Sequence, residues 1–152
     1  MNTDYSQIRI EQVDAFTFDF YDALNRYYLK VEIDAPTQLI IYTWHLFVPV
    51  EAIINTYIAV GKFIYAHQLK IIKGVSDLQY SEGSFEQHND WMSREYLPKS
   101  IKHGYKATAY VKPQDFYTAL ALELFLENNP EGHQYKILNT KEEALEWLKG
   151  IE

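Results

Sequence analysis

Histidine and carboxylate side chains are the groups in this chain best suited to hold a metal ion or to transfer a proton. The five histidines are His45, His67, His88, His103 and His133. No pair of them has the short spacing of a zinc site, and the H-E-x-x-H pattern of metalloproteases is absent. His88 stands between Glu86 and Asp90, a pattern typical of a solvated helix face. We therefore predict no metal ion and no cofactor.

The sequence also lacks the residue patterns of nucleophilic catalysis. The chain has no cysteine, which excludes disulfides, thiol catalysis and cysteine-based zinc sites. It has no G-x-S-x-G elbow, and Gly61-Lys62 lacks the upstream glycine of a phosphate-binding loop. Neighbouring carboxylates such as Glu142 and Glu143 fall on predicted solvent faces. The sequence therefore predicts a protein that is not an enzyme.

Length and charge limit the remaining classes of function. At 152 residues the chain is predicted to form one domain, residues 1–152. The net charge of −7 argues against binding of nucleic acid, because contacts with phosphate need clustered lysine and arginine. Lys99, Lys102, His103 and Lys106 form the densest basic cluster, at a predicted helix end where cations complement the helix dipole.

The N-terminus and the apolar segments bear on location. Residues 1–14 are polar, lack the apolar stretch of a signal peptide and are expected to form a flexible arm. The longest apolar run, 39–50, contains Thr43, Trp44 and His45 and is too short to span a bilayer. We therefore expect a cytoplasmic protein without an integral membrane segment.

The first half of the chain is predicted to open with an antiparallel meander. Apolar and polar residues alternate at 16–20 and at 29–33, which predicts two half-buried strands. Residues 39–47 are almost continuously apolar, as expected for a strand covered on both faces. Apolar residues at three- and four-residue spacing then predict a helix over about 50–67. A buried strand follows at 69–78, in which Gly74 is expected to mark a bulge or the close approach of another backbone.

The second half alternates helices and strands. A helix begins near residue 84 and must kink or end at Pro98, and a strand follows at 107–111. Pro113 opens the next helix, whose predicted inward residues are Phe116, Ala119, Leu120, Leu124 and Phe125. A strand at 135–138 precedes a last helix, capped by Thr140 and Glu143. The order predicts an α/β fold: a mixed β-sheet with an antiparallel N-terminal meander, βαβ units and flanking helices.

Aromatic residues are unusually frequent, at 16% of the chain with 13 tyrosines. Tyrosine suits positions with one apolar and one wet end, as at interfaces and pocket mouths. The aromatics that could line an apolar groove between helix and sheet are Tyr42, Trp44, Tyr57, Tyr65, Trp91, Tyr96, Tyr110, Phe116 and Tyr117. Packing in the core is the alternative for most of them, because aromatics at helical spacing usually face the core. Exposed tyrosines could also form the interface of a homodimer.

Several segments resemble a known family of small bacterial proteins. They are E-I-D-A-P-T-Q-L-I-I-Y-T-W-H-L-F-V, I-I-K-G-V-S-D-L, W-M-S-R-E-Y-L-P-K-S-I-K-H-G-Y-K and E-E-A-L-E-W-L. Over residues 27–151 the chain resembles SpoIIAA-like proteins of the STAS (sulfate transporter and anti-sigma factor antagonist) fold, also described as STAS/SEC14-like. The resemblance implies a mixed sheet flanked by helices, and a non-enzymatic regulatory module that binds a partner protein.

The same resemblance implies a serine that is phosphorylated to switch partner binding. Its place in this chain is the loop 77–84, which carries Ser81-Glu82-Gly83-Ser84 where the family has an Asp-Ser or Ser-Ser pair followed by Gly. A phosphate at Ser84 would sit at a helix N-terminus, which favours an anion. The alternative is that Ser84 is simply the N-cap of that helix, worth about 1 kcal/mol.

Two predicted functions use different residues. The first is binding of a protein partner through the loop and the start of the following helix, at Asp77, Tyr80, Ser81, Ser84, His88 and Trp91. The second is binding of a small apolar molecule, a lipid or fatty acid, in a pocket formed by Tyr42, Trp44, Tyr57, Tyr65, Tyr96 and Phe116.

Overall fold

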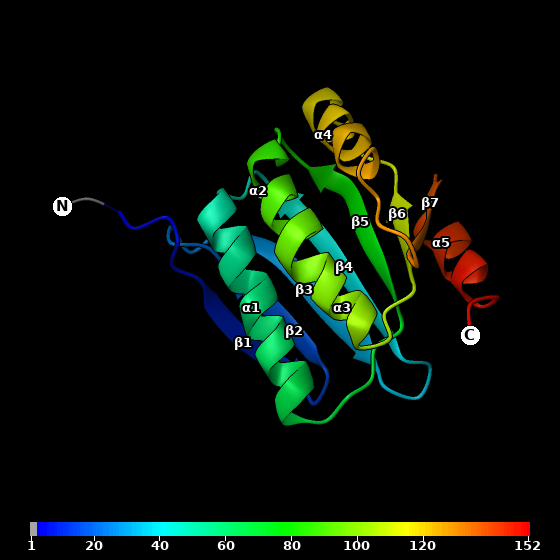
Figure 1. Cartoon of the computed structure of the whole chain (residues 1–152). Helices are drawn as coiled ribbons and strands as arrows, with labels where there is room; N and C mark the ends of the chain where they lie inside the picture. The colour runs from blue at the N-terminus through cyan, green and yellow to red at the C-terminus, as the bar shows by residue number, and fades with distance from the viewer. Residues whose placement is uncertain (1–2) are drawn as a thin grey trace.

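The computed structural model describes residues 3–152, which form a seven-stranded mixed sheet covered by helices (Figure 1). The strands are β1 (Arg9–Asp14), β2 (Thr17–Tyr21), β3 (Tyr27–Asp34), β4 (Leu39–Leu46), β5 (Lys73–Ser81), β6 (Ala107–Val111) and β7 (Gln134–Leu138). They lie in the sheet in the order of the chain. Pairing is antiparallel from β1 to β4 and parallel from β4 to β7. The predicted α/β class, with an antiparallel opening and parallel βαβ units, is confirmed.

The helices that connect the parallel strands cover one face of the sheet. They are α1 (Val50–Ala66), α2 (Glu86–Trp91), the π-helix η1 (Met92–Tyr96), α3 (Leu97–Lys102) and α4 (Phe116–Leu126). Each crossover moves one strand further in the same direction, so right-handed connections place these helices on the same side. Helix α5 (Lys141–Leu148) covers the other face, where Ala144 and Leu148 pack on Val75 and Ala109. Figure 1 shows α1 beside the continuous α2–η1–α3 helix.

The alternation of side chains along each strand divides the core between the two faces. In β4, Ile40, Tyr42 and Trp44 point to the face covered by α1, and Leu39 and Ile41 belong to the cluster under α5. All five residues of β6 are buried, as expected for a strand covered on both sides. The alternating pattern of β4 therefore decides which of its aromatic side chains lie under α1.

The N-terminal segment differs from the predicted arm. Residues 9–14 form strand β1, which pairs with β2 from Arg9 opposite Tyr21 to Asp14 opposite Thr17. All six residues of β1 are exposed, so its sequence lacks the alternating burial that identifies a strand. Backbone hydrogen bonds to β2 hold this edge strand without a buried side. Residues 1–2, also part of the predicted arm, lie outside the described residues.

The helix does not end at Pro98, which was one of the two predicted outcomes. The chain stays helical from Glu86 to Lys102, and the five residues before α3 adopt π-helical geometry. Pro98 follows the π turn directly, as the second residue of α3, so it lies inside a continuous helix where its missing N–H removes a backbone hydrogen bond. The wider turn before it accommodates the proline ring, a solution that the sequence did not indicate.

Helix α4 presents a different face to the core from the one predicted. Its buried residues are Thr118, Ala121, Leu122, Phe125 and Leu126. Of the predicted inward residues, Phe125 is buried, whereas Phe116 is 71% exposed and Leu120 is 43% exposed. The helix starts at Asp115 instead of Pro113, because the Asp115 carboxylate accepts hydrogen bonds from the backbone N–H groups of Thr118 and Gly83.

Two other sequence predictions concern single positions. A Cβ atom at Gly74 would lie 2.6 Å from the Tyr105 hydroxyl and 3.3 Å from the Ile40 carbonyl oxygen, so this glycine marks close approach and not a bulge. The predicted cap of α5 is present, since Thr140 Oγ1 accepts the backbone N–H of Glu143 at 3.1 Å. Within residues 3–152 no helix combines the length and the apolar content needed to cross a bilayer.

A candidate ligand cavity between the helices and the sheet

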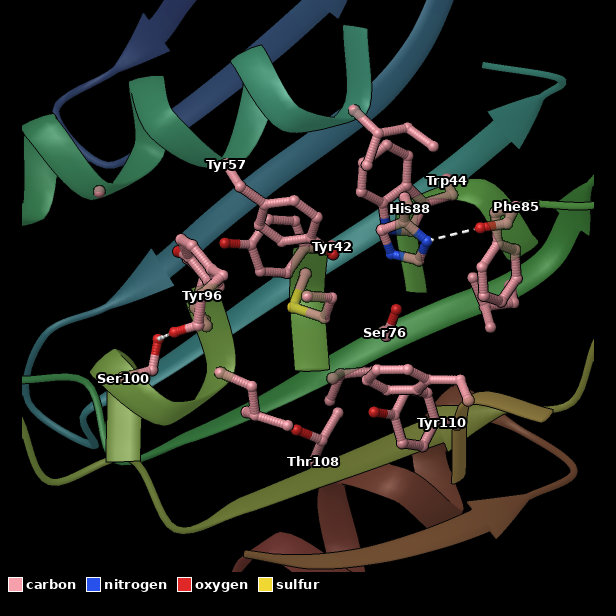
Figure 2. Close-up of a pocket in the computed structure, with 18 of the residues that line it drawn as sticks. Tyr42, Trp44, Tyr57, Ser76, Phe85, His88, Tyr96, Ser100, Thr108 and Tyr110 are labelled. Carbon is pink, nitrogen blue, oxygen red and sulfur yellow. Dashed lines mark hydrogen bonds between the residues drawn. The ribbon is translucent and has the colours of Figure 1, made fainter. Parts of the chain in front are cut away.

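A cavity of about 540 Å³ lies between the sheet and the helices that cover it (Figure 2). Its floor comes from β4, β5 and β6, its walls from α1 and the α2–η1–α3 helix, and α4 contributes Leu122 and Phe125. Cavities of roughly 300–1,000 Å³ with mostly apolar walls are the usual size of small-molecule sites. We call this space the aromatic cavity.

Aromatic rings from three elements form its central wall. Tyr42 and Trp44 of β4 stack with ring centroids 6.1 Å apart and an angle of 7° between their planes. Tyr57 of α1 packs on Tyr42 at 5.3 Å and on Tyr96 of η1 at 4.9 Å. These four residues, each named as a pocket candidate from the sequence, all line the aromatic cavity.

Of the other two predicted pocket residues, one lies at the rim of the aromatic cavity and one lies outside it. Tyr65 stands at the rim of the aromatic cavity with 88% of its surface exposed. Phe116 is 71% exposed and packs edge-on against Tyr117, away from the aromatic cavity. The prediction for Phe116 is wrong because α4 is apolar on nearly every side, so the spacing of its residues does not show which side meets the core.

Hydroxyl groups are the main polar feature of the middle of the aromatic cavity, between its charged ends. Ser76, Thr108 and Tyr110 reach it from the sheet, and the tyrosines of the wall add phenols. Burial raises the pKa of Tyr42 and of Tyr57 well above the ordinary value of 10.0. Burial also raises the pKa of Tyr96. These phenols therefore stay protonated at neutral pH and can orient a ligand by hydrogen bonds but do not act as bases.

His88 contributes a neutral imidazole to the wall of the aromatic cavity. It is buried, and its Nδ1–H donates to the Phe85 carbonyl at 2.7 Å (Figure 2). Burial lowers the pKa of His88, and the hydrogen bond to Phe85 only partly opposes this effect. The prediction of a solvated helix face is therefore wrong for His88, because α4 packs over this side of α2 and brings Phe125 against the imidazole.

A chain of directed hydrogen bonds runs from the aromatic cavity to a second buried histidine. The Asn129 amide nitrogen donates to the His133 carbonyl at 2.7 Å, which leaves the amide oxygen to accept from His133 Nδ1 at 2.6 Å. His133 Nε2 is then an acceptor for the Thr108 hydroxyl at 2.9 Å. The Tyr105 hydroxyl in turn donates to Thr108 Oγ1 at 2.6 Å. Tyr105, which lines the aromatic cavity, is left with accepting lone pairs.

The neutral state of His133 is part of the same arrangement. Burial lowers the pKa of His133 from 6.5 to about 4. A protonated imidazole would carry an N–H on Nε2 and would require Thr108 to reverse its hydrogen bond. The sequence contained no pattern that links Asn129, His133 and Thr108, because the turn before β7 and the middle of β6 are brought together only by the sheet.

The π-helix aligns one side of the helical wall with the aromatic cavity. His88, Met92, Tyr96 and Ser100 recur at four-residue spacing and all line it. In a regular α-helix this spacing drifts around the axis, because a turn holds only 3.6 residues. A π turn holds more residues, so it offsets the drift over this stretch. The Ser100 hydroxyl donates to the Tyr96 carbonyl at 3.0 Å, next to the position where Pro98 has no N–H (Figure 2).

The residues predicted as a partner-binding loop do not form one surface. Ser81, Ser84 and His88 line the aromatic cavity, whereas Asp77 is 3% exposed and binds Gln79 through its carboxylate. Tyr80 is half-exposed and stacks on His45, and Trp91 packs on Tyr57 and Tyr96. The N-cap position of α2 is Phe85, so the predicted cap at Ser84 is wrong; Ser84 Oγ instead accepts the backbone N–H of Glu86, two residues later, at 3.2 Å.

Several residues of the aromatic cavity escaped the sequence analysis. Gly61, Lys70, Lys99, Ser76, Tyr105 and Thr108 all line it. Gly61 had a signal that could have been used, because a glycine inside an otherwise regular helix needs a reason. Among residues 3–152, no three histidine, aspartate or glutamate side chains are placed to share a metal ion.

Comparisons with known proteins do not assign this chain to a family, so the function has to be argued from the residues of the aromatic cavity. A scan against models of known protein families gives no match, and a search of curated proteins gives none either.

Proposed function

We propose that this protein binds a small apolar molecule in the aromatic cavity. Gly61 carries the proposal. It lies in the interior of α1 and lines the aromatic cavity, and a Cβ atom built on it would meet nothing within 4 Å. Glycine inside a helix costs roughly 0.5–1 kcal/mol relative to alanine. No neighbour requires glycine here, so we infer that the missing side chain keeps space open for a ligand.

The walls indicate what kind of molecule would fit. Tyr42, Trp44 and Tyr57 offer ring faces, and Leu122 and Phe125 close one side. Each buried methylene group contributes about 0.8 kcal/mol. A ligand with ten to fifteen methylenes would gain roughly 8–12 kcal/mol before an association cost of at least about 4 kcal/mol. The balance corresponds to dissociation constants between about 1 mM and 1 µM.

A binding role also agrees with the chemistry of the polar groups. The phenols are held neutral, and His88, the buried histidine of the lining, keeps an unprotonated Nε2. None of the hydrogen bonds among residues 3–152 joins a hydroxyl of the lining to this imidazole, whose one partner is the Phe85 carbonyl. We therefore favour a carrier or sensor over an enzyme.

Ligand binding can be tested through Trp44, whose indole lines the aromatic cavity. Addition of a neutral C16 alcohol should change tryptophan fluorescence in a saturable manner. In the Gly61→Leu variant, the leucine side chain should occupy the same space and weaken binding at least about tenfold. Gly61→Ala is the matched control, since one methyl group leaves most of the 540 Å³ free. Saturable binding that is equally strong in Gly61→Leu would contradict the proposal.

A second candidate function is binding of a protein partner at the edge of the aromatic cavity. The resemblance to SpoIIAA-like proteins of the STAS fold supports it, and so does the exposure of Phe47 (50%) and Tyr80 (51%) at the ends of β4 and β5. Ser84 is exposed at this edge and Ser81 is half-buried. Ser84→Asp should therefore change partner capture more than Ser81→Asp, with the far-UV dichroism of both unchanged. Unchanged capture in both variants would count against a serine switch.

A further inference from the structure

The charges of this acidic protein are distributed very unevenly along the chain. Residues 52–76 and 96–114 together hold seven of the 14 basic residues and none of the 21 acidic residues. The seven are Lys62, Lys70, Lys73, Lys99, Lys102, Lys106 and Lys112. The remainder of the chain carries every carboxylate side chain. Two positive segments in a chain of net charge −7 indicate a local requirement for positive charge.

These two segments meet at one end of the aromatic cavity. Lys70, Lys99 and His103 line that end, where the backbone N–H of Lys106 donates to the Ile72 carbonyl at 2.7 Å. The Lys70 side chain passes close to Gly104, since its Cε lies 3.2 Å from where a Cβ on that glycine would be. In Figure 2 this end is marked by Ser100 and Tyr96, and the opposite end by His88 and Phe85.

The two lysines at this end have no carboxylate partner in the described part of the chain. Neither Lys70 nor Lys99 takes part in an ion pair there. Other lysines of the same segments are used differently: Lys73 Nζ donates to the carbonyls of Leu148 and Ile151, and Lys106 Nζ donates to that of Glu152. Lys70 and Lys99 are therefore available to a ligand that occupies the aromatic cavity.

The opposite end of the aromatic cavity has the other sign. Glu82 lines it together with Phe47 and Ser84, and no lysine or arginine of residues 3–152 contributes to that end. A ligand with one charged end would therefore bind in one orientation only. Between Ile53 and Tyr65, both of which line the aromatic cavity, twelve helical residues at 1.5 Å each span about 18 Å. One acyl chain covers half of a bilayer's hydrocarbon core, or about 15 Å.

We propose that the ligand is a single-chain amphiphile with an anionic headgroup, a carboxylate or a phosphate, bound with that headgroup at Lys70, Lys99 and His103 and with its alkyl chain along the aromatic wall. This assignment rests on the proposed function, because it concerns the same cavity. Solvation of lysines that merely complement the C-terminal dipoles of α1 and α3 is the competing explanation. The two explanations differ in which lysines matter.

The test compares two double variants with the same change in net charge. Lys70→Gln/Lys99→Gln removes the charges that line the aromatic cavity, and Lys62→Gln/Lys102→Gln removes exposed charges of α1 and α3 that do not. Each variant and the wild type are titrated with hexadecanoate, hexadecyl phosphate and hexadecanol, below their aggregation limits, with tryptophan fluorescence as the signal. The three ligands share one chain and differ only in the headgroup.

We expect the wild type to bind at least one anion about tenfold or more tightly than the alcohol, because a charge near two lysines at a partly wetted mouth gains an interaction of this order. Lys70→Gln/Lys99→Gln should lose that preference and keep the affinity for hexadecanol. The control pair should keep both. The anion that binds more tightly identifies the headgroup.

The remaining outcomes separate the two proposals. Equal affinity of the wild type for the alcohol and both anions would overturn the headgroup assignment and leave apolar binding intact. The headgroup assignment is also overturned if the two double variants lose the preference for the anion equally, because general surface charge would then account for that preference. If none of the three ligands binds the wild type, both the proposed function and this inference fail.

Discussion

Replacement of Gly61 by alanine should make the protein more stable. The glycine has helical neighbours on both sides within α1, and its Cβ position is free of contacts within 4 Å. Alanine therefore adds no clash and lowers the conformational entropy of the unfolded chain. The gain should be about 0.5–1 kcal/mol. For a chain of 152 residues this corresponds to a rise in Tm of roughly 1–4 °C.

Urea unfolding and calorimetry of the ligand-free protein measure this effect directly. Ala59→Gly in the same helix is the reverse control, and it should lower the free energy of unfolding by a similar amount. Gly61→Leu should keep or raise the stability, because the leucine side chain buries apolar surface in unoccupied space. A loss of stability in Gly61→Ala would refute the reasoning, since it would mean that the space beside α1 is filled or that the backbone there needs glycine.

Three other predictions concern the fold around the aromatic cavity. The pKa of His133 is lowered to about 4 by burial, so the unfolded state binds the extra proton and stability should fall as the pH drops from about 6.5 to 4. The full difference in pKa corresponds to a loss of roughly 3 kcal/mol in the free energy of unfolding, and relaxation around the charge should reduce this loss to about 2 kcal/mol. In urea titrations, His133→Gln should lack this part of the pH dependence. Gly74→Ala should cost about 1–3 kcal/mol because its Cβ would lie 2.6 Å from the Tyr105 hydroxyl, and Tyr105→Phe should recover part of that loss in a double-mutant cycle. Thr140→Ala should cost about 1 kcal/mol in thermal unfolding, because it removes the cap of α5.

Strands with one or two buried faces could be predicted from the sequence, and the exposed edge strand could not. Alternation at 16–20 and 29–33 and the apolar run at 39–47 correspond to β2, β3 and β4. Strand β1 has no buried residue, so its pairing leaves no alternation in the sequence; it is held by backbone hydrogen bonds and by exposed contacts such as Arg9 over the Tyr21 ring. The face of α4 was predicted wrongly because the helix is apolar on nearly every side, so its sequence contains no stripe that marks the buried face.

A residue of the candidate site could be predicted from the sequence only where its own helix or strand decides which way its side chain points. Tyr42 and Trp44 share a face because they are two residues apart in β4. His88 was misjudged because its burial depends on α4, a helix that comes almost thirty residues later. Lys70 and Lys99 lie in different segments, and nothing in either segment shows that they border the same space. Such information is contained in the three-dimensional arrangement and not in local periodicity.

The strict agreement between chain order and strand order has a consequence for how the protein is made. Every strand pairs only with its neighbours in sequence, so the chain can extend the sheet from β1 onward as it leaves the ribosome, with little loop-closure entropy at each step. The rings of Tyr42, Trp44 and Tyr57 can meet as soon as α1 has been synthesised. The floor of the aromatic cavity is complete only when β6 adds Thr108 and Tyr110 beside β5. A nascent chain therefore acquires its aromatic wall well before it can enclose a ligand.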